Sequence, residues 1–137
     1  MDASYGAIRR RVARERGQSL AELALLLPVL LIFALGAVDF GRVYATDVQV
    51  RAAAQKGVQY GSTSATNASD AAAIQTAATD GVNLSASPTV TSSVFADNSG
   101  GQAVQVTVET SFHTLISWPG LPHTSTISHS AVAKVLQ

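Results

Sequence analysis

Hydrophobic positions are concentrated in one run near the start of the chain. Residues 20–38 form 19 consecutive positions whose only charged residue is Glu22, and twelve of them are Leu, Ile, Val or Phe. Together the twelve favour membrane insertion by roughly 5 kcal/mol, whereas a carboxylate near the end of the span costs less than about 3.5 kcal/mol. At about 1.5 Å per residue the run covers a hydrocarbon core of ~30 Å. We therefore predict a transmembrane helix; a buried core helix of a soluble protein is the alternative.

The helical pattern continues beyond this run. Apolar residues recur at spacings of three and four, at positions Phe40, Val43, Tyr44 and Val48. Asp47 and Arg51 are spaced for an i,i+4 ion pair, and Gly61 is a suitable helix stop. We predict one long helix over residues 18–61, which Pro28 interrupts and bends because proline removes a backbone hydrogen bond.

The chain becomes polar after this helix. Residues 62–70 read STSATNASD, which predicts a linker. Ser69 or Asn67 can then cap a short helix over roughly residues 70–80, and Gly81 would close it.

Three β-rich segments follow, at residues 89–95, 103–112 and 124–136. In the middle segment, valines at 104, 106 and 108 would face one side and polar residues at 105, 107 and 109 the other. A turn at 96–101 and a loop at 117–123, which contains Trp118, would connect the segments. The pattern predicts an α+β fold in which a small helix packs on an antiparallel sheet.

Charge is distributed unevenly between the head and the body of the chain. Residues 1–17 contain five arginines and two acids, whereas residues 18–137 contain four bases and seven acids. The positive-inside rule places this basic head in the cytoplasm and the residues after the span outside it. Bases confined to a short head do not indicate a nucleic-acid-binding surface. The absence of cysteine excludes disulfides, thiol catalysis and cysteine metal sites.

Candidate catalytic and metal-binding residues are few. The three histidines, His113, His123 and His129, lie on a strand end, a loop and a strand, without the close spacing of a metal site. No Gly-x-Ser-x-Gly elbow and no phosphate-binding glycine loop occurs in the sequence. We therefore expect no enzyme, no metal and no cofactor; a membrane-anchored hydrolase that uses the histidines is the remotest alternative.

A glycine precedes the apolar run and a glutamate follows five residues later, in the segment GQSLAE that starts at Gly17. With its arginine-rich head, this arrangement resembles the class III signal of type IV prepilins. The resemblance implies that an aspartyl prepilin peptidase cuts between Gly17 and Gln18 on the cytoplasmic side. Residues 1–17 would then be a leader peptide, and Glu22 would be the fifth residue of the mature chain.

The same resemblance implies a role for Glu22. In filaments of this superfamily a glutamate at this position is thought to pair with the N-terminal amine of a neighbouring subunit. A carboxylate without a partner in an apolar setting is costly, so it favours subunit registers that bring a partner to it. The alternative is a carboxylate that reaches the head-group level and has no role in assembly.

Residues 16–62 are more specifically similar to the TadE-like family of tight-adherence (Tad/Flp, type IVc) pilus proteins. The residues that carry this resemblance are Asp39, Phe40, Gly41, Arg42, Gly57 and Tyr60. The valine-rich strand, the proline-glycine loop and the small-residue strand near the C-terminus also resemble the family's closing hairpin. The resemblance implies a type IV pilin-like fold. A length greater than that of a major Flp pilin favours a minor pilin or pseudopilin, and Gln18 replaces the aromatic residue that begins many mature type IV pilins.

Two pairs of residues mark the predicted membrane exit. Asp39 and Arg42 are spaced i,i+3 and would pair between subunits or form a local surface ion pair. Phe40 and Tyr44 would be interfacial anchors or would pack on the body of the protein.

The sequence thus favours a minor pilin or pseudopilin of a Tad/Flp-type pilus. Its partners would be the prepilin peptidase, other pilin subunits, the Tad-type assembly platform and a membrane crossed once by residues 20–38. The precursor would lie in the bacterial inner membrane with residues 62–137 as an extracytoplasmic α+β domain, which could become part of an extracellular pilus. The alternative is an uncleaved, membrane-anchored extracellular binding or adhesion module.

Overall fold

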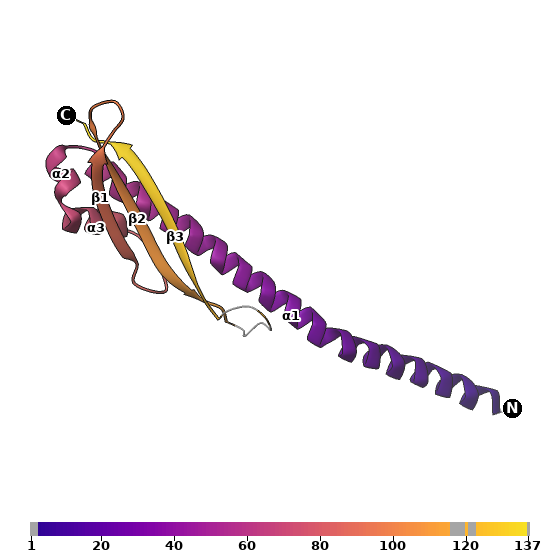
Figure 1. Ribbon diagram of the computed structural model, residues 1–137. Helices are drawn as coiled ribbons and strands as arrows, with labels where there is room; N and C mark the ends of the chain where they lie inside the picture. The colour runs from indigo at the N-terminus through magenta and orange to yellow at the C-terminus, as the bar shows by residue number, and fades with distance from the viewer. Residues whose placement is uncertain (1–2, 116–119, 121–122, 137) are drawn as a thin grey trace. The chain divides into compact units, whose positions relative to one another are not determined.

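The computed structural model describes residues 3–115, 120 and 123–136, with side chains from residue 18 onward. It divides into two compact units, Met1–Val38 and Asp39–Gln137. Helix α1, Ala3–Gly61, runs through both (Figure 1) and ends at the predicted glycine. Pro28 lies inside α1, and the helix continues on both sides of it.

Two short helices follow α1. Helix α2, Ala65–Ser69, lies where a linker was predicted; it forms because the Ser64 hydroxyl accepts a hydrogen bond from the Asn67 N–H. Helix α3, Ala71–Thr79, was predicted with slightly longer bounds. The sequence predicted Ser69 or Asn67 as its N-cap, but the N-cap is Asp70. The Asp70 carboxylate accepts a hydrogen bond of 3.0 Å from the Ala73 N–H. The charged cap is the better acceptor, because a carboxylate also complements the positive end of the helix dipole.

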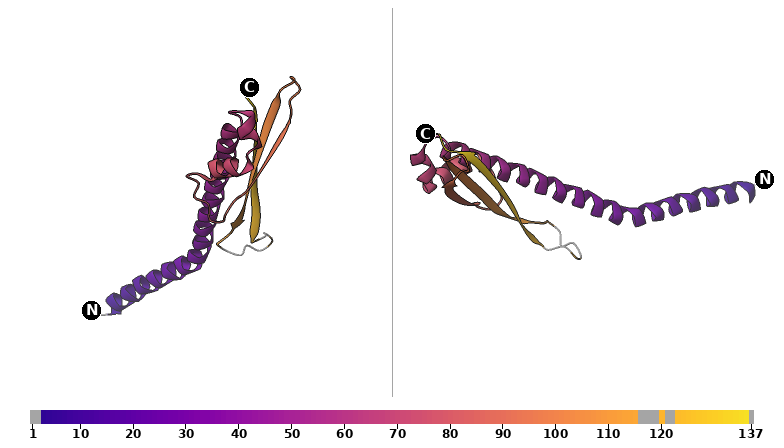
Figure 2. Two further views of the ribbon diagram at one scale, coloured as in Figure 1. Left: turned by 90° about the vertical axis from the view of Figure 1, so that its left-hand side faces the viewer. Right: turned by 45° about the horizontal axis from the view of Figure 1, so that its top comes forward.

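The three predicted strands form one antiparallel sheet in the order β1-β2-β3. Their bounds are Thr89–Ala96, Gln102–His113 and Thr124–Lys134. Within the Asp39–Gln137 unit, the sheet lies along one side of the second half of α1 (Figures 1 and 2). The loop predicted at 117–123, including Trp118, lies largely outside the described residues.

The hydrophobic core of this unit lies between the sheet and the helices. The valines at 104, 106 and 108 of β2 are fully buried, which confirms the predicted alternation. They meet Ile74 of α3 and a row of small residues on α1, namely Val50, Ala53, Ala54 and Val58. Gly57 permits this close packing, since a Cβ there would lie 2.9 Å from the Val106 side chain.

The structure therefore has the α+β arrangement that the sequence predicts, with a long N-terminal helix followed by small helices and an antiparallel sheet.

Candidate functional site

Glu22 lies on α1 at the start of the apolar segment, and its side chain is exposed. Its Oε1 atom accepts a hydrogen bond of 3.1 Å from Nε2 of Gln18, one turn earlier. The donor is a neutral amide, so the carboxylate keeps its charge uncompensated by this contact. The helix thus presents an exposed carboxylate one turn after Gln18.

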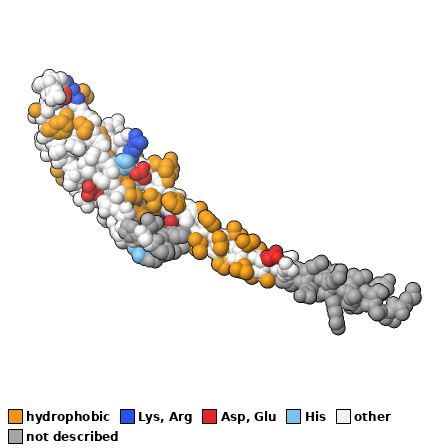
Figure 3. All heavy atoms as spheres, turned by 45° about the vertical axis from the view of Figure 1, so that its right-hand side comes forward, with side chains coloured by type: hydrophobic (Ala, Val, Ile, Leu, Met, Phe, Trp, Pro, Cys, Tyr) orange, Lys and Arg blue, Asp and Glu red, His pale blue; other side chains and the backbone are white. Residues whose placement is uncertain are grey.

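The rest of this segment presents apolar side chains in every direction. The large hydrophobic residues of positions 20–38 are between 43% and 78% exposed, and hydrophobic side chains cover this part of the helix in Figure 3. Among the described residues, one helix, within Gln18–Gly61, is long and apolar enough to cross a membrane. Such a surface needs lipid or other helices around it, because exposed apolar area in water is unfavourable.

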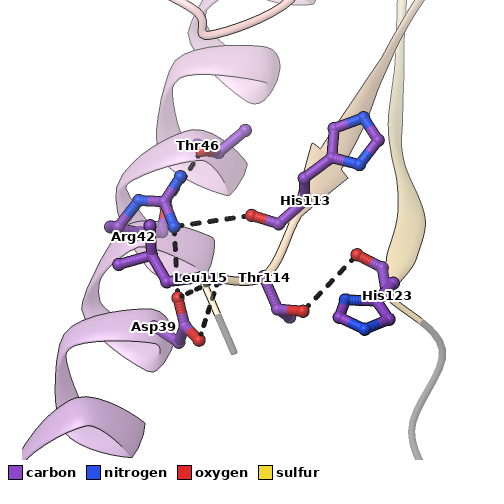
Figure 4. Close-up of polar contacts among 7 residues, drawn as sticks. All are labelled: Asp39, Arg42, Thr46, His113, Thr114, Leu115 and His123. Atoms are coloured by element: carbon purple, nitrogen blue, oxygen red, sulfur yellow. Dashed lines mark hydrogen bonds and ion pairs between the residues drawn. The ribbon is translucent and has the colours of Figure 1, made fainter. Parts of the chain in front are cut away.

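Asp39 follows this segment directly and is 4% exposed. Its Oδ1 and Oδ2 atoms lie 3.1 and 3.2 Å from the backbone nitrogen of Leu115, just after β2, so the Leu115 N–H is shared between them. The Asp39 carboxylate also pairs with the Arg42 guanidinium at 3.1 Å. Figure 4 shows this carboxylate between the helix and the segment that leaves β2. Asp39 thereby fastens the end of β2 to α1.

Arg42 completes this anchor. Its Nη1 atom donates to the carbonyl oxygen of His113 at 3.4 Å, and its guanidinium lies 5.0 Å from the centre of the Phe112 ring. An arginine over an aromatic face gains a cation–π attraction in addition to its ion pair. We call Asp39, Arg42 and the backbone groups of His113 and Leu115 the exit anchor. Asp39 and Arg42 form an ion pair within one chain, as one of the two alternatives predicted. The Asp39 carboxylate is buried, however, whereas that alternative placed the pair on the surface.

Phe40 and Tyr44 do not pack on the body of the protein. Their side chains are 76% and 73% exposed, so that alternative was wrong. The aromatic residues instead point away from the core on the turn of α1 that carries the exit anchor.

The ion pair predicted between Asp47 and Arg51 is replaced by another contact. Oδ1 of Asp47 lies 2.7 Å from Nε2 of His129 on β3, which joins α1 to the sheet. His113 instead contacts the Thr124 hydroxyl through Nδ1 at 3.1 Å. Across the part of the chain that the structure describes, no three His, Asp or Glu side chains gather as metal ligands would.

Sequence reasoning found Asp39 and Arg42 but missed their partners. The partners are a backbone N–H, a backbone carbonyl and a ring face at or just after the end of β2, 70 to 76 positions away in the chain. Backbone groups carry no sequence signal, so an acidic residue directly after the apolar run was the one available hint.

Comparison with known proteins gives one match. Residues 17–59 match the model of the TadE-like protein family. The searches of curated proteins and of solved structures found no match. The matched segment begins at the glycine before the predicted cut and includes both Glu22 and the Asp39–Arg42 pair. Residues 17–59, which lie in helix α1, are thus similar to this family's model, as the sequence motifs indicated.

Proposed function

We propose that this chain is a minor pilin or pseudopilin of a Tad/Flp-type pilus. The precursor crosses the inner membrane once with its basic head in the cytoplasm, and prepilin peptidase cuts it after Gly17. The mature chain, from Gln18, is then drawn into the filament or primes its assembly through the first half of α1. The observation that carries this proposal is the TadE-like match over residues 17–59.

The exposed apolar surface of α1 supports both proposed stages, the precursor in the membrane and the mature chain in the filament. Large hydrophobic side chains are at least 43% exposed throughout residues 20–38. Lipid tails can cover this surface in the membrane, and neighbouring α1 helices can cover it in a filament. The transfer from one to the other therefore exposes little apolar area to water.

In the filament, Glu22 would select how neighbouring subunits align along their α1 helices. Within the chain it has the neutral Gln18 amide as a donor. Cleavage would create a positive α-amino group at residue 18. A carboxylate removed from water gains most from a charged partner, so a subunit register that brings a free amine to Glu22 would be preferred over its neighbours.

Filament fractionation tests this assembly role. Epitope-tagged wild-type chain and the variants Glu22→Ala, Glu22→Gln and Glu22→Asp would be expressed in a piliated host. Immunoblots of sheared filaments and of membranes would then be compared. We expect all four proteins in the membrane and trimmed alike, with the Ala and Gln variants absent from filaments and from complexes with other pilins.

Ser99→Ala, in the hairpin between β1 and β2, is the matched control and should assemble as the wild type does. Normal incorporation of Glu22→Ala would contradict the role of Glu22. A wild-type chain that stays untrimmed and never associates with pilin subunits would instead identify the uncleaved binding module.

A further inference from the structure

The exit anchor fixes the position of Leu115, just after β2, along α1. Asp39 is the first residue after the apolar run 20–38, and its carboxylate lies within 3.2 Å of the Leu115 nitrogen. Leu115 is therefore held beside the first helical turn that follows the membrane-spanning residues. One residue of helix advances the chain by about 1.5 Å, so this turn lies at the boundary between hydrocarbon and water.

The side chains at this level are apolar and uncovered. Leu115 is 61% exposed, and Phe40 and Tyr44 are 76% and 73% exposed. Tyrosine and tryptophan are enriched where hydrocarbon meets head groups, because an apolar ring with a polar group suits both environments, as it would for Tyr44. The wholly apolar ring of Phe40 suits the hydrocarbon side of the same boundary. The exposed leucine fits the same environment, whereas in water its position would be unfavourable.

The polar groups nearby are already paired within the protein. The Asp39 carboxylate binds Arg42 and the Leu115 N–H, and Arg42 also donates to the His113 carbonyl. A buried polar group is costly in a low-dielectric setting when it is unpaired, and much less so when its hydrogen bonds are made. The exit anchor can therefore enter the interfacial region without leaving its charges unsatisfied.

We propose that the end of β2 is a second membrane contact, in which Leu115, together with Phe40 and Tyr44, lies in the lipid interface and Asp39 holds it there. The occupant of this surface is the bilayer, because in the sequence a single residue, Asp39, separates Phe40 from the apolar run 20–38. This contact requires only that α1 spans the membrane, so it does not depend on cleavage or on pilus assembly. It would attach the folded unit to the membrane at two points, the helix and the sheet.

Spin labelling tests the contact directly, because the chain contains no cysteine. Nitroxide labels would be placed on the full chain through Leu115→Cys, through Ser99→Cys in the turn between β1 and β2, and through Leu30→Cys within the span. The protein would be studied in phosphatidylcholine nanodiscs, and collision with oxygen and with a water-soluble nickel chelate would be measured. We expect the label at 115 to lose nickel accessibility relative to 99 and to gain oxygen accessibility, with values between those at 99 and 30.

Asp39→Ala, combined with each label, tests the anchor. We expect the label at 115 to recover nickel accessibility, while labels at 30 and 99 keep their signals, which shows that the span and the fold persist. A label at 115 as open to nickel as that at 99 would overturn the membrane contact. Protection at 115 from both reagents would mean that protein, not lipid, covers the surface, and an unchanged signal in Asp39→Ala would overturn the role of Asp39.

Discussion

The two carboxylate oxygens of Asp39 share the backbone N–H of Leu115, at 3.1 and 3.2 Å, although 76 positions separate the residues in the chain. Within the Asp39–Gln137 unit, this contact joins the segment after β2 to the first turn of α1 that follows the apolar run. A side chain in the segment that matches the TadE-like family model thus holds the backbone just after β2.

Removing the carboxylate should loosen this end of the sheet. In Asp39→Ala the Leu115 N–H loses its acceptor and Arg42 loses its charged partner. Hydrogen bonds to charged groups contribute about 1.5–3 kcal/mol each, so we expect a loss of roughly that size in the free energy of unfolding. Asp39→Asn retains one acceptor and should lose less. Hydrogen exchange of the Leu115 amide in the detergent-solubilised full chain measures the effect.

Glu109→Gln is the control for this experiment, because Glu109 is an exposed carboxylate on β2 that contacts Ser128. It should leave the Leu115 exchange rate unchanged. Equal protection of this amide in Asp39→Ala and in the wild type would contradict the exit anchor.

Two glycines of α1 should respond oppositely to alanine. A Cβ at Gly57 would lie 2.9 Å from Cγ1 of Val106 and 3.1 Å from Cβ of Ala78, whereas a Cβ at Gly41 meets nothing within 4 Å. Overpacking a core costs about 1–3 kcal/mol, and alanine exceeds glycine in helix propensity by about 1 kcal/mol. Chemical denaturation should therefore show Gly57→Ala destabilised and Gly41→Ala unchanged or stabilised. The same sign for both variants would contradict the helix–sheet packing.

Double-mutant cycles should distinguish the two possible partners of Asp47. Oδ1 of Asp47 lies 2.7 Å from Nε2 of His129, and this contact joins α1 to β3. We expect a coupling free energy of about 0.5–1 kcal/mol between Asp47→Asn and His129→Gln, because the pair is half exposed. The cycle of Asp47→Asn with Arg51→Gln, measured at the same pH, should give a value near zero. A larger coupling in the second cycle would restore the helical i,i+4 pair.

Much of the fold follows from local sequence patterns. The strict alternation of β2 gives its buried valines, because it depends on the period of a single element, and α1 ends at the predicted Gly61. The cap of α3 was misplaced by one or three residues, since Asp70, Ser69 and Asn67 are all residue types that cap helices well and the sequence leaves the first helical residue undecided.

The buried face of α1 could not be read from hydrophobicity. The larger residues Phe40, Tyr44 and Val48 are exposed, whereas Ala53, Ala54 and Gly57 face the sheet. Small residues are selected there because the sheet approaches the helix closely, a tertiary constraint that periodicity does not record. Similarly, the motif identified Asp39, but its partner is a backbone amide at the end of another element.

The hairpin between β1 and β2 should respond to acid. The pKa of Asp97 lies below its ordinary value of 3.8, chiefly because the Ser99 hydroxyl donates to its carboxylate and also because of the Lys134 charge. A lowered folded-state pKa stabilises the fold above pH 3.8, and this contribution is lost as pH falls through the folded-state value. Ser99→Ala should move the pKa of Asp97 back towards 3.8, as an NMR titration of the carboxyl carbon would show. An identical titration in both proteins would contradict this cause.

Determining the N-terminal residue of the mature chain tests the proposed function most directly. Intact mass and terminal sequencing would be applied to wild-type chain and to Gly17→Ala, each isolated from cells that contain prepilin peptidase. We predict that the wild-type chain begins at Gln18 and that Gly17→Ala retains its arginine-rich head. If both proteins keep residues 1–17, the chain is not processed as a pilin and the proposed pilus function is contradicted.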